Sequence, residues 1–270
     1  MSEFTYNSTV IDYDIIGTGT PMLFLHGWGM DKRIMTGSFE PVFASQNNYR
    51  RIYIDIPGMG KSIAGNIVNS DDILAVLHAF VKEIIGEKFI IVGESYGGYL
   101  ARGYINQHRE MISGVILLCP LVYAGSRQGR FEALKVITRD DKFLKTLSKE
   151  QYDCFTYMNV VLTQAVYERF SRDIMPAIEN QNRYFLDEVL DGSCSFNVDK
   201  LEQPFEKPCL IIVGKQDTEV GYKDQFDLLT NYPNATYCVI NGAGHNLQIE
   251  QTEMFETIVK QWLLDFSSQK

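Results

Sequence analysis

Cysteine is scarce in this chain and follows no pairing pattern. The 270 residues include five cysteines, an odd number with wide spacing and no C-x-x-C pair: Cys119, Cys154, Cys194, Cys209 and Cys238. Several of them lie inside apolar runs, where a free thiol behaves as a small hydrophobic group. The chain also shows no cluster of residues with metal-ligand spacing. We therefore expect a reducing compartment and a protein that needs no metal and no organic cofactor.

Positive charge is in short supply as well. Lysine and arginine number 25 against 34 aspartates and glutamates, which gives a net charge of −9 without a long block of one sign. A chain this acidic repels phosphate backbones and anionic lipids. Nucleic acid and membrane surfaces are therefore poor candidate partners.

Long apolar runs are absent too. No stretch approaches the roughly 18 apolar residues of a membrane span. The first ten residues, MSEFTYNSTV, lack the basic end and the apolar stretch of a signal peptide. The composition, 45% hydrophobic and 22% charged, is otherwise that of a globular protein. We expect a soluble, cytoplasmic protein that binds a small-molecule substrate, with a homodimer left open.

Short, continuously apolar segments recur along the chain, and most of them end at Gly or Pro: 21–26, 51–56, 88–93, 114–119, 208–214 and 235–240. Because their apolar residues do not alternate with polar ones, we predict strands covered on both faces, as in a parallel sheet. Helical patterns lie between them, among them 70–85, with an N-cap at Ser70 and a stop at Gly86, and 247–266. This alternation predicts an α/β fold, with residues 5–16 adding one or two antiparallel edge strands.

One long stretch breaks the alternation. Between Cys119 and Pro208 the sequence shows only helical patterns, at 128–139, 149–158, 163–170 and 183–190. Ser148 and Gln151 have the spacing of a capping box. We predict an all-helical cap, or lid, over residues 123–206, inserted into a core made of residues 1–122 and 207–270. The chain has no internal repeat and no low-complexity linker.

The segment Gly93-Glu94-Ser95-Tyr96-Gly97 fits the nucleophile elbow G-x-S-x-G. It follows the apolar run FIIV and precedes a helical segment, which is the strand–turn–helix setting that the motif requires. Such a turn strains the serine backbone and leaves no room for side chains at positions 93 and 97. It raises the Ser95 hydroxyl above the strand end, with the Tyr96 N–H facing the reacting oxygen. The alternative is a glycine-rich turn with an incidental serine.

A second turn, His26-Gly27-Trp28-Gly29, follows the apolar segment PMLFL. Acyl transfer needs two N–H donors aimed at the developing oxyanion. A turn at a strand end can direct a backbone N–H into the site, so Trp28 is the natural donor to accompany Tyr96. The alternative is a simple turn in which Trp28 packs. We expect His26 to be structural.

A serine nucleophile needs a histidine base and a carboxylate that orients it. Of the four histidines, His78 and His108 lie in or near helical patterns, whereas His245 lies in the turn NGAGH after a predicted strand. Asp217 follows another strand in the same way. The order Ser95, Asp217, His245 matches that of hydrolases with a nucleophile elbow. Glu219, Asp224 and Asp227 are rival carboxylates, and Asp217 could instead cap a helix.

Taken together, these segments resemble the α/β-hydrolase fold family, in its capped serine-hydrolase branch: LHGWG (25–29), DIPGMGKS (55–62), VGESYGG (92–98), IIVGKQD (211–217) and GAGH (242–245). The resemblance spans nearly the whole chain. It implies an eight-stranded sheet, a helical cap after the sixth strand, and the triad Ser95, Asp217 and His245. It also implies an oxyanion hole formed by the backbones of Trp28 and Tyr96.

Membership of a fold family does not select a substrate. Ser95 excludes the aspartate nucleophile of epoxide hydrolases and haloalkane dehalogenases. The cap is rich in apolar and aromatic residues, and we expect Phe131, Phe155 and Tyr157 to wall a pocket above Ser95. Such a pocket favours an apolar acyl or alcohol group.

The sequence therefore predicts a serine hydrolase that cleaves carboxylic esters of small to medium apolar substrates through an acyl-enzyme. A C–C bond hydrolase of meta-cleavage-type diketones is one alternative. An iminopeptidase is another, although its elbow usually has the letters GGSWG instead of GESYG. A ligand receptor without turnover is the alternative that is not an enzyme.

Overall fold

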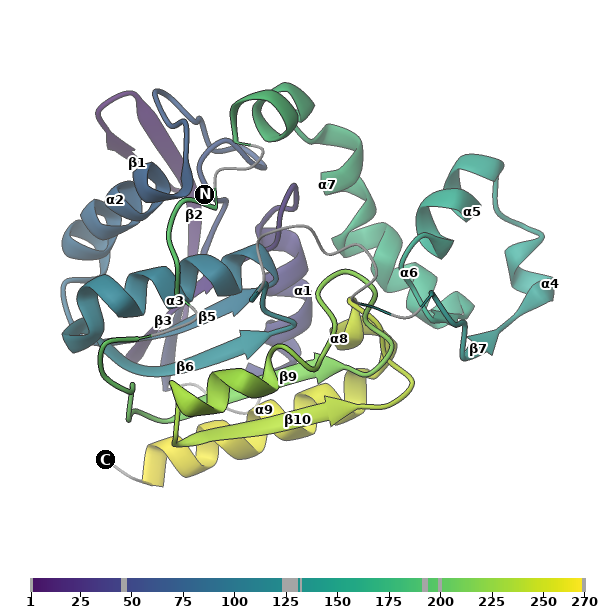
Figure 1. The fold of residues 1–270 in the computed structure, drawn as a ribbon. Helices are drawn as coiled ribbons and strands as arrows, with labels where there is room; N and C mark the ends of the chain where they lie inside the picture. The colour runs from purple at the N-terminus through teal and green to yellow at the C-terminus, as the bar shows by residue number, and fades with distance from the viewer. Residues whose placement is uncertain are drawn as a thin grey trace.

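An eight-stranded sheet forms the centre of the molecule (Figure 1). The computed structural model describes residues 2–44, 48–122, 131, 133–190, 194–198 and 201–268. The strand order is β1 (Ser2–Tyr6), β2 (Thr9–Ile16), β4 (Tyr49–Ile54), β3 (Thr20–Leu25), β5 (Phe89–Glu94), β6 (Ile112–Leu118), β9 (Cys209–Gly214) and β10 (Ala235–Ile240). Strands β1 and β2 run antiparallel to their neighbours, and the pairs from β4 to β10 are parallel. The predicted α/β fold with an eight-stranded, mostly parallel sheet is confirmed.

Both faces of the sheet are buried, because alternate side chains of a strand point to opposite faces. In β5, Ile91 enters one apolar core and Ile90 enters the other, and both are fully buried. Residues of α2 (Ser70–Phe80) and α3 (Tyr96–His108) complete the first core, and residues of α1 (Lys32–Phe43) and α9 (Thr252–Ser268) complete the second. Burial on two faces explains the unbroken apolar segments of the sequence.

The start of α2 differs from the expectation by one residue. Asn69 is the cap, because its backbone is extended and its side chain accepts a hydrogen bond from the Asp72 N–H at 2.9 Å. Ser70 is the first helical residue. The helix continues through a π-helical turn, η1 (Val81–Ile85), and stops at Gly86 as predicted, with a left-handed φ of 69°. Short 3-10 turns are η2 (Arg109–Met111) and η4 (Phe226–Thr230).

The C-terminal helix is broken where the sequence suggested one continuous helix over 247–266. Gln251 separates α8 (Leu247–Glu250) from α9. Its side-chain amide donates a hydrogen bond to the Gly242 carbonyl at 2.7 Å. This bond holds the end of α8 against the preceding loop, and the chain changes direction before α9 begins.

Residues 133–190, which we call the lid, contain most of the predicted helices: α4 (Asp141–Leu144), α5 (Lys149–Thr156), α6 (Gln164–Asp173), α7 (Met175–Asn180) and the π-helical η3 (Phe185–Val189). The capping box of Ser148 and Gln151 is present. Figure 1 shows α4 and α5 standing away from the sheet. The boundaries 123 and 206 of the insertion stay a prediction.

The expectation of an all-helical insertion is wrong at two dipeptides. Strands β7 (Thr138–Arg139) and β8 (Val161–Leu162) form a parallel pair within the lid. The Asp140 N–H also donates to the Leu162 carbonyl at 2.9 Å, so pairing satisfies backbone groups that a helix would have satisfied. The helix expected at 128–139 is therefore wrong over 133–139, and its remaining residues, except Phe131, lie outside the described part of the chain.

Phe155 forms the core of the lid and does not line a pocket. Its side chain is fully buried, and its ring centroid lies 5.2 Å from that of Tyr167 and 5.4 Å from that of Phe170. The side chain of Tyr157, two residues further on, is 68% exposed. At the end of α5 the Phe155 ring thus points into the core of the lid, and the Tyr157 ring points away from that core.

We expect Phe155→Ala to lower the free energy of unfolding by about 3–5 kcal/mol, because it removes a large buried ring and leaves a cavity. Tyr157→Ala is the matched control on the same segment and should cost less than about 1 kcal/mol. Urea titration followed by circular dichroism measures both variants. Equal losses in the two variants would contradict this assignment of the lid core.

Candidate active site

The turn between β5 and α3 has the strained geometry that the elbow motif predicts. Ser95 has φ 51° and ψ −114°, outside the regions that residues with a side chain favour. A Cβ atom at Gly93 would collide with the backbone of Gly97, and one at Gly97 would collide with the Leu25 carbonyl. Both glycines are therefore required for close approach of the backbone. The strand–turn–helix prediction is confirmed.

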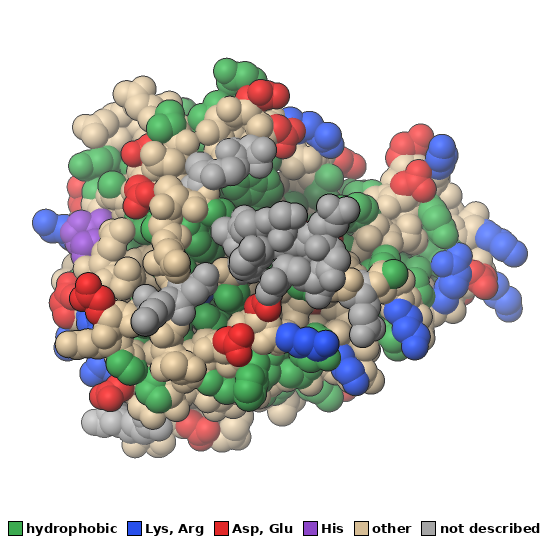
Figure 2. Space-filling view, in the orientation of Figure 1, with side chains coloured by type: hydrophobic (Ala, Val, Ile, Leu, Met, Phe, Trp, Pro, Cys, Tyr) green, Lys and Arg blue, Asp and Glu red, His purple; other side chains and the backbone are tan. Residues whose placement is uncertain are grey.

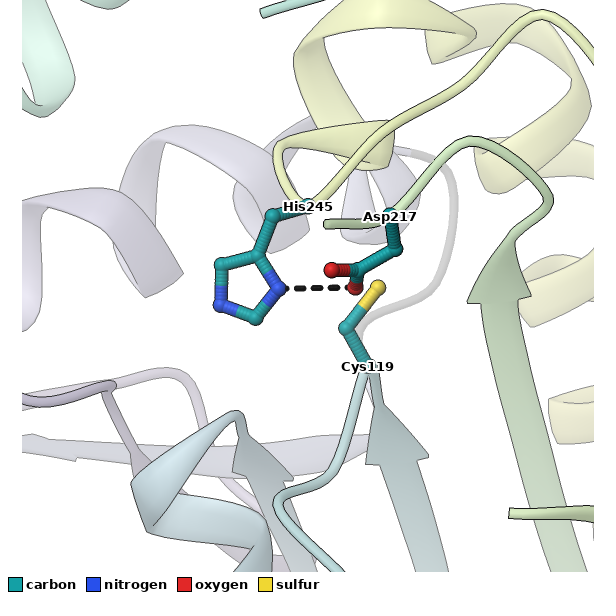
Figure 3. Close-up of side chains that lie close together, drawn as sticks. All are labelled: Cys119, Asp217 and His245. Carbon is teal, nitrogen blue, oxygen red and sulfur yellow. Dashed lines mark hydrogen bonds and ion pairs between the residues drawn. The ribbon is translucent and has the colours of Figure 1, made fainter. Parts of the chain in front are cut away.

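The structure brings the three predicted residues into one chain of hydrogen bonds. Ser95 follows β5, Asp217 follows β9 and His245 follows β10, so all three lie where parallel strands end. The Ser95 hydroxyl lies 3.0 Å from His245 Nε2 and can donate to it. On the other side of the ring, His245 Nδ1–H donates to Asp217 Oδ2 at 2.8 Å, the bond drawn in Figure 3.

Asp217 is held as an anion by its surroundings. Burial would raise its pKa, but the His245 ring opposite it and the backbone N–H groups of Val220 and Glu219 lower the pKa below its ordinary value. Those N–H groups donate to Oδ1 at 3.0 and 2.8 Å. The alternative role of Asp217 as a cap for the next turn is thus compatible with its bond to His245. The rival carboxylate Glu219 donates its backbone N–H to Asp217, whereas Asp217 itself is the carboxylate bonded to His245.

Sequence reasoning missed a thiol beside this pair. Cys119 follows β6, is fully buried and has a φ of 42°. Its sulfur lies within 4.8 Å of ligand atoms of Asp217 and His245, and the three side chains lie close together in Figure 3. Burial raises the pKa of the thiol to about 12, so it keeps its proton. A cation here would have to displace that proton and the bond that orients His245, so we assign no metal site.

His245 is a strong base in this setting. Burial alone would lower its pKa, but Asp217, through charge and hydrogen bond, raises the pKa well above the ordinary value, with smaller contributions from Cys119 and Glu94. The other expected histidine role is also confirmed. His26 Nε2 accepts from the Ile56 N–H at 2.9 Å, and Nδ1–H donates to the Gly27 carbonyl, so this ring is structural.

Trp28 and Tyr96 lie near the nucleophile and contact each other. Trp28 belongs to the loop after β3 and Tyr96 is the first residue of α3. Their rings pack edge to face with centroids 5.1 Å apart. Trp28 therefore has the packing role that we named as its alternative.

A cavity of about 690 Å³ opens above these residues and is lined by both the sheet loops and the lid. Its apolar lining includes Met30, Ile34, Leu121, Phe170, Ile174 and Ile178. Of the three aromatic residues expected to wall it, only Tyr157 does so. Phe155 is in the lid core, and Phe131 lines a separate hollow of about 620 Å³ beside the Asp217 loop. Figure 2 shows hydrophobic side chains at the junction of body and lid.

Glu250 connects the lid to the loop that carries His245. Its carboxylate accepts hydrogen bonds from the Val160 and Val161 N–H groups of the lid at 2.5 and 3.2 Å, and from the Gly244 N–H at 2.6 Å. Burial raises its pKa to about 7. Sequence reasoning missed this residue, because Glu250 lies within the helix predicted over 247–266 and belongs to no motif.

Comparison with known proteins decides the family. A family model described as alpha/beta hydrolase fold matches residues 20–252. The chain belongs to the alpha/beta hydrolase family. None of the helices in the described part of this hydrolase combines the length and apolarity that a membrane crossing requires.

Three relatives of this hydrolase illustrate its range. A solved alpha/beta superfamily hydrolase from Oenococcus oeni PSU-1 is 31% identical, with a TM-score of 0.88 over 99% of this chain and 100% of that one. A 2-hydroxy-6-oxononadienedioate/2-hydroxy-6-oxononatrienedioate hydrolase of Burkholderia vietnamiensis is 24% identical over 94% of this chain and 90% of its own. A pimeloyl-[acyl-carrier protein] methyl ester esterase of Aeromonas hydrophila is 26% identical over 94% and 99%.

The raised pKa of Glu250 predicts how the stability of the protein changes with pH. Because its pKa is raised on folding, the folded protein binds a proton between about pH 4.5 and 7 that the unfolded chain has released, so its contribution to stability falls as pH rises through that window. Glu250→Gln cannot titrate. From pH 5 to pH 8 the wild type should therefore lose more free energy of unfolding than the variant, by up to about 3 kcal/mol. Urea titrations at both pH values test this, and parallel losses would contradict it.

Proposed function

We propose that this hydrolase cleaves carboxylic esters of small to medium apolar substrates, with Ser95 as nucleophile, His245 as general base and acid, and Asp217 as the orienting carboxylate. The observation that carries the proposal is the hydrogen-bonded chain Ser95–His245–Asp217 at the floor of a largely apolar cavity. A strained nucleophile, a base within 3.0 Å and a buried acid are the elements that acyl transfer needs.

In the first half of the reaction, the Ser95 oxygen attacks the ester carbonyl while His245 Nε2 takes the hydroxyl proton. Asp217 accepts the Nδ1–H bond throughout, which fixes the tautomer and stabilises the imidazolium. The backbone N–H groups of Trp28 and Tyr96 would donate to the oxyanion of the tetrahedral intermediate. The imidazolium then passes its proton to the departing alcohol, and the acyl group stays on Ser95.

In the second half, water attacks the acyl-enzyme. His245 takes a proton from that water and returns one to the Ser95 oxygen as the acid is released. No further reactant is required, because every proton that His245 accepts is given to the leaving group of the same step.

The charges around the cavity favour a neutral ester over a dicarboxylate. Three acidic residues line it, Glu94, Asp153 and Glu219, and its described lining includes no arginine or lysine. The dienedioate named for the Burkholderia relative carries two carboxylates, which would meet charges of their own sign here. The Aeromonas relative is named for a methyl ester, which is consistent with the proposal.

A C–C bond hydrolase is the second candidate. The Burkholderia relative, whose name gives a 2-hydroxy-6-oxo substrate, aligns over 94% of this chain. For this reaction the same triad would have to act on a diketone substrate that carries carboxylates. The described lining of the cavity offers no cationic side chain to bind them. The first test is therefore to compare substrates directly.

We expect p-nitrophenyl butyrate and ethyl butyrate to be hydrolysed with higher kcat/KM than a 2-hydroxy-6-oxo-dienedioate or L-proline β-naphthylamide. The physical reason is the apolar lining and the like charges that a dicarboxylate would meet. Parallel assays at one pH measure the ranking. Preferential turnover of the dienedioate would favour the C–C hydrolase, preferential turnover of the proline amide would favour the iminopeptidase, and binding without any turnover would favour a receptor.

Ser95→Ala should lower kcat for p-nitrophenyl butyrate by more than about 10³-fold, because removal of a serine nucleophile costs several orders of magnitude. The smaller side chain suits the strained turn, so circular dichroism should be unchanged. Ser268→Ala, at the exposed end of α9, is the control and should keep wild-type activity. A fluorophosphonate probe should label wild-type Ser95. Near wild-type turnover by folded Ser95→Ala, or labelling of another serine, would refute the assignment.

A further inference from the structure

A second carboxylate faces the catalytic histidine from the side opposite Asp217. Glu94 is the last residue of β5, next to Ser95, and is only 2% exposed. Its Oε1 lies 3.6 Å from His245 Nε2, the nitrogen that also faces the Ser95 hydroxyl at 3.0 Å. The imidazole therefore stands between two buried carboxylates, one at each nitrogen.

Local packing leaves the Glu94 carboxylate only partly satisfied. Glu94 Oε2 is buried and has no hydrogen-bond partner among the described residues. Gly27 packs directly against it, and a Cβ atom at position 27 would collide with Oε2. Leaving a buried acceptor without a partner costs stability, whereas an apolar side chain of similar shape would not. The other group that the Glu94 carboxylate faces is the catalytic imidazole of His245.

The charge of Glu94 depends on its neighbours within the physiological pH range. Burial raises its pKa to about 7, His245 lowers it, Asp217 raises it, and the Gly27 backbone N–H lowers it. The two titratable groups among these, Asp217 and His245, belong to the loops after β9 and β10, and Gly27 belongs to the loop after β3. From the end of β6, Cys119 acts on the same imidazole as a neutral thiol. Glu94 and His245 therefore act on each other's pKa: His245 lowers that of Glu94, and Glu94 raises that of His245.

We propose that Glu94 is a positioning residue of this enzyme: its carboxylate places a second negative charge against His245 Nε2, stabilises the imidazolium that forms in each transition state, and moves the working range of the enzyme to higher pH. The inference rests on the proposed function, since it acts through the base of the same triad.

The negative charge of Glu94 has one unfavourable and one favourable effect on activity. In the pH range above about 7, where Glu94 is ionised, its charge favours the protonated form of His245, which delays the rise of activity with pH. At high pH the histidine is neutral, and Glu94 favours the charged imidazolium of the transition state, so the plateau of activity is higher. Removing the charge should therefore shift the rise of activity to lower pH and reduce the plateau together. A change that merely loosened the site would reduce the plateau without moving the rise.

The test is the pH dependence of kcat/KM for p-nitrophenyl butyrate between pH 5 and 9.5, in the wild type and in Glu94→Gln. The glutamine keeps the shape and removes the charge. We expect the acid limb to move down by about one pH unit and the plateau to fall about tenfold, the change that one unit of pKa represents. Glu94→Asp keeps a charge and should restore part of both effects. Asp153→Asn removes a carboxylate from the lid side of the same cavity and should leave the acid limb in place.

An acid limb that stays in place in Glu94→Gln, with or without a lower plateau, would overturn the proposal, as would an equal shift in Asp153→Asn. If Glu94→Gln does not fold, carboxyl ¹³C and imidazole NMR titrations of the wild type decide instead. A His245 titration with a step at the midpoint of Glu94 supports the proposal, and independent titrations overturn it. Failure of the proposed function is distinguishable, because it appears as residual turnover in Ser95→Ala, whereas failure of this inference leaves that variant inactive.

Discussion

The turn that joins β5 to α3 has to change direction within a single residue, and Ser95 takes a φ of 51° to do so. That conformation is costly for a residue with a side chain and persists only where the surroundings enforce it. Here the enforcement comes from the sheet on one side and from α3 on the other, with two glycines where any Cβ atom would collide. The hydroxyl is thereby placed at the end of a buried strand, and the other active residues are positioned relative to it.

The parallel sheet supplies those other residues at the same edge. Because β5, β6, β9 and β10 run in one direction, Ser95, Cys119, Asp217 and His245 all follow carboxyl ends that lie together. The arrangement concentrates negative charge around one imidazole in a place with little water. Burial raises the pKa of Glu94 and of Glu250, while hydrogen bonds keep Asp217 ionised. The pKa of His245 is raised mainly by Asp217, with smaller contributions from Cys119 and Glu94.

The lid is bonded to that histidine loop and does not simply cover it. Glu250 accepts from lid and loop at once, and the side-chain amide of Asn246 donates to Asn159 of the lid at 3.1 Å. Tyr157 and Met158, immediately before these contacts, line the cavity. Side chains that meet a substrate are therefore connected by short bonds to the backbone that holds the base.

The sequence by itself determined the α/β alternation and the elbow, because continuous apolar segments and Gly-x-Ser-x-Gly are local patterns with local causes. It also indicated antiparallel pairing at the N-terminal edge, but left open whether one or two strands form it. It also led to Asp217 and His245, through turn residues that directly follow strands. Tertiary structure alone decided the rest. Phe155 and Tyr157 lie two residues apart with similar side chains, and only packing against α6 shows that one is core and the other lines the cavity. No sequence pattern singles out Glu94, Cys119 or Glu250, since Glu94 and Cys119 act on His245, and Glu250 binds the neighbouring Gly244 N–H, only through contacts between segments distant in the chain.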